Sequence, residues 1–150
     1  MKQLFLKFSI IVAVIMAFGF TGKNTINSNK IIACYIIELD GSNEVPQVNT
    51  GARGIAIIRV TAERQLLTKV VAHRLDASKD GALTAAYIHA GAAGSNGPVL
   101  VTMAAGSGDF DQDMAQWLTA NQYQALLNDP IYVNVYSTAN PSGLIRGQMR

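Results

Sequence analysis

The stretch IIACYIIELDGSNEVPQVNTGARGIAIIRV, residues 31–60, places two apolar runs on either side of a polar segment. The first run, 31–39, is rich in Ile and ends at Asp40-Gly41, a dipeptide typical of turns. The second run, 55–60, is again rich in β-branched side chains. Short runs of this composition between turn residues predict β-strands, so the stretch predicts two strands joined by a long connection.

The same pattern recurs along the rest of the chain. Turn residues separate the runs, at Asp80-Gly81, at Asn96-Gly97-Pro98 and at 140–143. Seven short strands with such punctuation predict an all-β domain, an immunoglobulin-like or Greek-key β-sandwich or barrel. The five further predicted strands are 66–75, 83–90, 99–104, 131–136 and 144–149.

One segment, 120–127, has helical rather than strand periodicity. Thr119 with Gln122 three residues later forms a capping box, and Asn128-Asp129-Pro130 ends the pattern. The apolar side chains recur at helical spacing. The sequence therefore predicts one short helix, which we expect to cover an open end of the sandwich.

The first nineteen residues have the features of a secretory signal peptide. Lys2 and Lys7 precede an apolar run over 8–18, and Ala17 and Gly19 are the small residues of a cleavage site. The run is shorter than the roughly 20 residues that span a bilayer. We expect signal peptide 1–19, flexible spacer 20–30 and domain 31–150. The mature protein would be secreted across the cytoplasmic membrane, periplasmic or extracellular, with no stable membrane insertion.

Charge and cysteine content narrow the expected partners. Without Lys2 and Lys7, ten basic residues face ten acidic ones, which argues against nucleic acid as a partner. Cys34 is the only cysteine, so no internal disulfide is possible. The residues before Cys34 resemble a lipobox, but a polar segment separates them from the apolar leader, which argues against lipid anchoring. We expect Cys34 to be buried in its strand.

Three motifs together carry a resemblance to a known family. They are NEVPQVNTGARGIA (43–56), TAAYIHAGAAGSNGPVLV (84–101) and YVNVYSTANPSGLIRGQM (132–149). In this order and spacing they resemble the CHRD domain, which was first described as a repeat in chordin and occurs singly in secreted bacterial proteins. The resemblance implies an immunoglobulin-like barrel with limited similarity to copper/zinc superoxide dismutase, and no general biochemical function.

The chain departs from the family pattern at two histidine positions. Tyr87 stands where the family motif A-H-I-H-x-G has its first His, and Tyr136 stands where Y-V-N-V-H-T has its His. Copper and zinc sites need about three or four nitrogen or sulfur ligands, and this chain offers only His73, His89 and Cys34. We therefore expect no metal and no cofactor. A copper- or zinc-binding, superoxide-dismutase-like redox protein is the alternative.

Alternation on the strands suggests candidate binding residues. Tyr87 and His89 share one face of their strand, and Tyr132, Asn134 and Tyr136 share one face of another. If the intervening valines face the core, this polar and aromatic face looks outward or into an end pocket. Such residues are typical of patches that bind glycans or proteins, although they are also ordinary outer-face residues. The candidates are Tyr87, His89, Asn134 and Tyr136. In a purely structural role, His89 would bond the following loop beside Tyr87.

Two further predictions concern charged residues. Glu44 and Arg146 lie in the first and last family motifs, and we expect them to pair and to join the two ends of the domain. Asp109, Asp111 and Asp113 alternate as at the start of a calcium loop, but Met114 stands where that loop needs Gly, which favours a solvated acidic loop.

No nucleophile or nucleotide-binding motif is present in the sequence. Together with the near-neutral charge and the missing histidines, this predicts a protein that is not an enzyme. We expect a secreted binding or structural module whose partner is an unknown extracytoplasmic protein or glycan.

Overall fold

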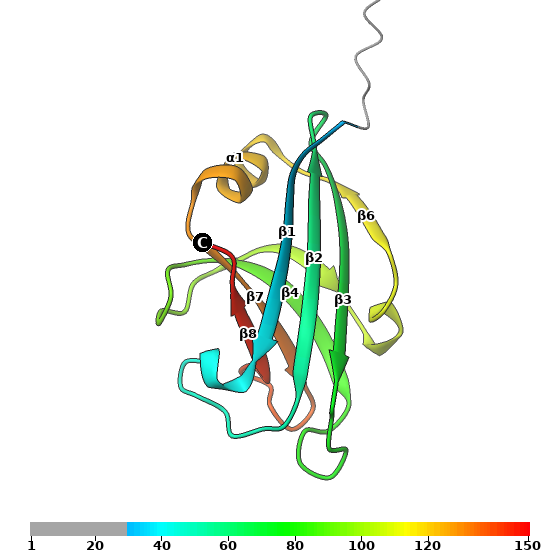
Figure 1. The fold of residues 1–150 in the computed structure, drawn as a ribbon, viewed down its shortest axis with the longest axis vertical. Helices are drawn as coiled ribbons and strands as arrows, with labels where there is room; N and C mark the ends of the chain where they lie inside the picture. Colours follow the sequence, from blue (N-terminus) through cyan, green and yellow to red (C-terminus); the bar gives the residue numbers. More distant parts are fainter. Residues whose placement is uncertain (1–29) are drawn as a thin grey trace, which may run out of the picture.

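The computed structural model describes residues 30–150, so the predicted signal peptide and nearly all of the predicted spacer lie outside the described residues. Over these residues the chain is all-β with one short α-helix, as the sequence predicts (Figure 1). The elements are β1 Ile31–Asp40, η1 Gly41–Asn43, β2 Arg53–Thr61, β3 Gln65–His73, β4 Leu83–Ala90, β5 Val99–Ala104, η2 Ser107–Asp109, β6 Met114–Trp117, α1 Ala120–Asn128, β7 Ile131–Ser137 and β8 Ile145–Gln148.

The strands form one antiparallel sheet in the order β5-β4-β7-β8-β1-β2-β3-β6. The sheet curls into a nearly closed barrel, so the barrel form of the predicted fold is the one observed (Figure 1). The two edge strands are joined by a side chain, since Gln116 Nε2 on β6 donates to the Thr102 carbonyl on β5 (2.7 Å). This topology brings β4, β7 and β8 side by side, which positions the site described below.

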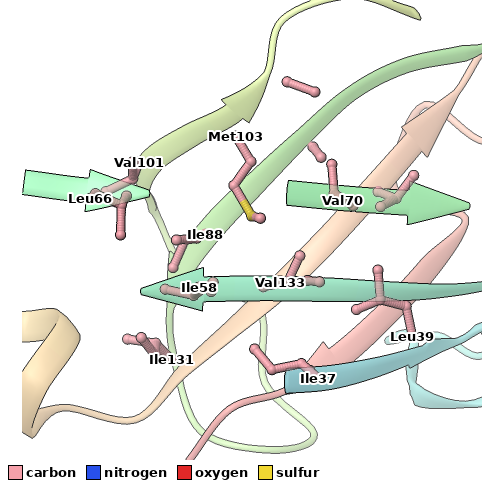
Figure 2. Packing of buried hydrophobic residues seen from close by; sticks show 14 of the residues in the cluster. Ile37, Leu39, Ile58, Leu66, Val70, Ile88, Val101, Met103, Ile131 and Val133 are labelled. Carbon is pink, nitrogen blue, oxygen red and sulfur yellow. The ribbon is translucent and has the colours of Figure 1, made fainter. Parts of the chain in front are cut away.

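The inward side chains of the strands make the core. Ile37 and Leu39 of β1 and Ile58 of β2 face Ile88 of β4 and Val133 of β7 across the barrel interior (Figure 2). The period-2 alternation of each strand is the reason that one set of side chains is buried on this face. Removing this apolar surface from water is the main source of stability for a domain without a disulfide.

Helix α1 forms where the sequence predicts it and runs one residue further, to Asn128. Thr119 and Gln122 make the predicted capping box, in which the Thr119 side chain accepts from Gln122 N and the Gln122 side chain accepts from Thr119 N. Such a cap stabilises a helix by about 1 kcal/mol. Leu126 is buried in the core, and the helix lies at one end of the barrel (Figure 1). Within residues 30–150, no helix is long and apolar enough to cross a membrane.

Two sequence-based expectations about the strands are wrong. The sequence predicts seven strands, whereas the described residues form eight, because the short MAQW segment of β6 has no run of β-branched residues but pairs with β3. Cys34 is exposed, not buried. It pairs with Arg59 on the outer face of β1 and β2, where an apolar neighbourhood in the sequence does not imply burial.

Candidate binding site

The outer face of β4, β7 and β8 carries a cluster of polar and aromatic side chains. Because Val133 and Val135 face the core, their neighbours on β7 point to the other side of the sheet. Strand pairing sets His89 opposite Tyr132 and Tyr87 opposite Asn134. We call this set the outer cluster; it consists of Tyr87, His89, Tyr132, Asn134, Tyr136 and Arg146.

The outer cluster is largely covered by loops rather than open to solvent. His89, Tyr132 and Asn134 are buried, while Tyr87 and Tyr136 stay half-buried. The cover comes from the loop between β4 and β5, whose Asn96 Nδ2 also donates to the Val45 carbonyl of the loop after β1 (2.8 Å). Of the four predicted binding residues, only the two tyrosines therefore present part of their side chains at the surface.

His89 has both ring nitrogens engaged. Its Nδ1 lies 2.9 Å from the Gly97 carbonyl oxygen, and its Nε2 lies 2.9 Å from the Tyr136 hydroxyl. A carbonyl oxygen only accepts, so Nδ1 carries the hydrogen, and Nε2 of the neutral ring accepts from Tyr136. Burial lowers the pKa of His89 and raises the pKa of Tyr136 to about 12, which keeps both groups uncharged.

Arg146 binds the β4–β5 loop that covers the outer cluster. Its side chain is 1% exposed, and its guanidinium carbon lies 3.5 Å from the centroid of the Tyr132 ring. Nη1 donates to Asn96 Oδ1 (3.1 Å), and Nη2 donates to the carbonyls of Ala92 (3.3 Å) and Ser95 (2.8 Å). The cation is thereby satisfied by three acceptors of one loop.

Tyr132 on β7 stacks with side chains from both neighbouring strands, β4 and β8. The His89 ring from β4 lies parallel to it, with centroids 4.8 Å apart at an interplanar angle of 6°, while Arg146 comes from β8 on the other flank of β7. The Tyr132 hydroxyl accepts from Gly97 N–H (3.0 Å). Gly97 is thus held through both its N–H and its carbonyl.

Glu44 and Arg146 are brought together, but not as the predicted ion pair. Asn43 Nδ2 donates to the Arg146 carbonyl (3.1 Å), so the first and last motifs do meet. Among the described residues, however, no salt bridge joins Glu44 to Arg146. The reason is that the guanidinium is already committed to the loop carbonyls.

Glu44 is a buried carboxyl group with an incomplete set of partners. It is 4% exposed; Oε2 accepts from Asn134 Nδ2 at 3.4 Å, and Oε1 has no hydrogen-bond partner. Burial raises the pKa of Glu44 to about 7, although the nearby charge of Arg146 acts in the opposite direction. The group therefore titrates near neutral pH, far above an ordinary glutamate.

The raised pKa of Glu44 predicts a specific pH dependence of stability. Between the unfolded pKa of about 4.3 and the folded value of about 7, the folded state keeps a proton that the unfolded state has lost. The contribution of Glu44 to the free energy of unfolding is therefore fully present below pH 4 and is lost as the pH rises to 7. We expect the free energy of unfolding of Glu44→Gln to rise by about 2 kcal/mol relative to that of wild type between pH 5 and pH 8. This is less than the whole shift because part of the stability is already lost at pH 5. Urea unfolding at the two pH values measures this difference, and parallel curves would contradict it.

A groove lies beside the exposed parts of Tyr87 and Tyr136. Its volume is about 440 Å³, and no charged side chain lines it. The two tyrosine rings are 5.4 Å apart between centroids, tilted by 57°. We call it the tyrosine groove; its other lining residues include Thr84, Val99, Ser137 and Thr138. Sequence reasoning missed these four, because only the pairing of β4 with β7 and with β5 brings their segments together.

The remaining candidate ligands are spread over the barrel. Cys34 lies on β1 and His73 ends β3, whereas His89 lies on β4. Residues 30–150 contain no group of three or more His, Cys, Asp or Glu side chains that could hold a metal ion.

The acidic loop before β6 is largely exposed, as predicted, and its carboxylates also make contacts with neighbouring groups. Asp111 pairs with Lys69 (2.9 Å) and Asp113 with Arg59 (3.5 Å), while Asp109 Oδ2 accepts from Ala105 N–H (2.8 Å). The three carboxylates therefore serve different partners and do not converge on one point.

Comparison with known proteins gives one match. The family model of the CHRD domain matches residues 35–149, nearly the whole described chain. No curated protein and no solved structure matches this chain. The three motifs of the sequence fall within the matched residues, and the outer cluster is built from the last two of them. The chain belongs to the CHRD domain family.

Proposed function

We propose that this CHRD domain is a secreted, non-enzymatic module that binds a neutral glycan through the tyrosine groove. The observation that carries the proposal is a groove of about 440 Å³ that two tyrosines line and no charged side chain enters. Binding sites of this kind combine an apolar, aromatic surface with a few polar groups that orient the ligand. An uncharged lining favours an uncharged ligand.

The groove residues suit a sugar in particular. Tyr87 and Tyr136 offer aromatic surface, and Thr84 and Thr138 at the rim are exposed and carry hydroxyl groups. Sugars present both apolar C–H faces and hydroxyls, so they match aromatic rings flanked by hydroxyl side chains. The hydrogen bond from Tyr136 to His89 holds one ring in place before any ligand arrives. Such preorganisation reduces the entropy lost on binding.

The same contacts support binding rather than catalysis. His89 is the one titratable group of the outer cluster that would usually serve as a base or metal ligand near neutral pH. Both of its ring nitrogens are engaged, and burial holds its pKa below the ordinary value. In this arrangement His89 acts as a support for Tyr136.

Replacing Tyr87 by Ala tests the groove. We expect at least tenfold weaker binding of neutral oligosaccharides, selected from a panel by wild-type protein, because a central aromatic residue of a site contributes about 2 kcal/mol. Isothermal titration calorimetry measures the effect. Trp117→Ala is the matched control, since Trp117 is an exposed aromatic residue on β6, away from the groove. An equal loss of affinity in both variants would mean that binding is unspecific. If no oligosaccharide of the panel bound and the wild-type protein bound a protein partner instead, the proposal of a glycan ligand would be wrong.

Export is part of the proposal and has its own test. We expect the protein recovered from the cell envelope or the medium to begin after residue 19, with the mass of the unmodified chain from residue 20 onward. N-terminal sequencing and intact-mass measurement check this. A full-length chain in the cytoplasm would contradict export, and a chain that begins at an acylated Cys34 would contradict the absence of a lipid anchor.

A further inference from the structure

A second and larger hollow lies on the other side of the outer cluster. It has a volume of about 740 Å³ and is bounded by the loop after β1, by Ala93 and Gly94 of the β4–β5 loop, and by β1 and β8. It shares no lining residue with the tyrosine groove. We call it the β1–β8 cleft.

Three polar side chains of the cleft, Arg146, Asn43 and Gln148, donate hydrogen bonds to the protein itself. Arg146 donates to acceptors in the covering loop, and Asn43 Nδ2 donates to the Arg146 carbonyl. Gln148 Nε2 donates to the carbonyls of Gly91 (3.1 Å) and Ile131 (3.0 Å). These donors hold the protein's own backbone and are not available to a ligand.

The acceptors of the cleft lining are, by contrast, unused. Glu44 Oε1 and Gln148 Oε1 are buried atoms without a hydrogen-bond partner. Glu38 adds an exposed carboxylate from β1, and no salt bridge of the described residues includes it. Buried acceptors without a donor are costly. A ligand that brings several N–H donors would satisfy them.

The charge and the walls of the cleft restrict the ligand further. Two carboxyl groups, Glu38 and Glu44, and one guanidinium line the cleft, and the guanidinium is hydrogen-bonded to the β4–β5 loop. An ammonium group carries three donors and no acceptor, and it complements such a lining. Beside the carboxyl groups, Ile36 is 72% exposed and Pro46 is also exposed, which offers apolar surface to a hydrocarbon chain.

We infer that the β1–β8 cleft binds a small alkylammonium ligand, with Glu44 and Glu38 as its charge partners and Ile36 against its hydrocarbon chain. This site is independent of the proposed glycan groove. The bound cation would provide the donor that Glu44 Oε1 lacks, and its charge would favour the ionised form of Glu44.

Titration calorimetry with 1,4-diaminobutane tests the inference directly. We expect binding to the wild-type protein at low ionic strength, with 1,4-butanediol as the neutral isostere that does not bind. Glu44→Gln should weaken binding at least about tenfold, the value of one lost charge-assisted hydrogen bond. Glu38→Gln should weaken it by a smaller factor, because this carboxylate is exposed. Glu63→Gln, an exposed acid in the β2–β3 turn, is the control without effect.

Proton release gives a second readout. Glu44 must lose its proton to pair with the cation, so affinity should rise between pH 6 and pH 8, and wild-type protein should release protons that Glu44→Gln does not. The other groups that act on Glu44 are Arg146 on β8 and Tyr136 on β7, and neither changes charge in this range. Equal binding of diamine and diol, undiminished binding by Glu44→Gln, or no binding at millimolar diamine would overturn the inference. Tyr87→Ala should leave diamine binding unchanged, so the glycan proposal and the alkylammonium proposal are tested independently.

Discussion

Replacing Arg146 by Met is expected to lower the free energy of unfolding by about 3–5 kcal/mol. The Met side chain keeps most of the buried apolar stem but removes the guanidinium that donates to Asn96 Oδ1 and to the carbonyls of Ala92 and Ser95. Those part-buried acceptors would lose the guanidinium donor, and each hydrogen bond to a charged group is worth about 1.5–3 kcal/mol. The stacking of the cation on Tyr132 would be lost as well.

Urea unfolding of matched variants measures this effect. Arg146→Lys should fall between wild type and Arg146→Met, because an ammonium keeps the charge but does not reproduce the planar fork. Arg53→Met is the control, since Arg53 pairs with Asp40 (2.9 Å) in a partly exposed salt bridge worth about 0–1 kcal/mol. If Arg146→Met cost no more than Arg53→Met, Arg146 would not be the residue that holds the loop.

Replacing Gly97 by Ala is expected to cost about 2–4 kcal/mol and to displace the β4–β5 loop. A Cβ at this position would lie 1.6 Å from the Ala90 carbonyl oxygen and 2.8 Å from its carbon. The obstacle is backbone at the end of β4, so relief requires the loop to move. That movement would break the bond from Gly97 N–H to the Tyr132 hydroxyl and the bond from His89 Nδ1 to the Gly97 carbonyl.

Two measurements separate this effect from a general loss of stability. Urea unfolding gives the cost, and the NMR signal of the His89 ring N–H reports whether its bond to Gly97 survives. Gly106→Ala is the control, because its Cβ would meet nothing within 4 Å and its backbone is extended, with φ of −165°. A Gly97→Ala protein with wild-type stability and an unchanged His89 signal would contradict the described loop path.

The strands and the helix could be predicted because their signals are local. The runs of 31–39 and 131–136 are rich in β-branched residues and lie between turn residues, and Thr119 with Gln122 marks the helix start within four residues. Strand β6 could not be predicted, since its four residues form a strand only by pairing with β3. The exposure of Cys34 could not be predicted either, because alternation separates two faces of a strand without saying which face is buried.

The sequence predicted only part of the candidate site. Alternation places Tyr87 with His89, and Asn134 with Tyr136, on common faces, but it does not show that β4 and β7 are neighbours. It also does not show that loops cover this face and leave only the two tyrosines near the surface. The Glu44–Arg146 pair illustrates the same limit. Their segments meet as expected, while the bonds of Arg146 are decided by a loop about fifty residues away in the chain.

The sequence by itself determined the family, the all-β class and the set of chemical groups available to the protein, because these depend on residue identity and short-range periodicity. Only the tertiary structure decided how those groups are used. Folding β8 beside β7 buries Arg146 under the β4–β5 loop, engages both nitrogens of His89 and leaves Glu44 Oε1 without a donor. Hydrogen bonding and burial depend on which distant segments meet, and that is a property of the packed barrel rather than of any stretch of its sequence.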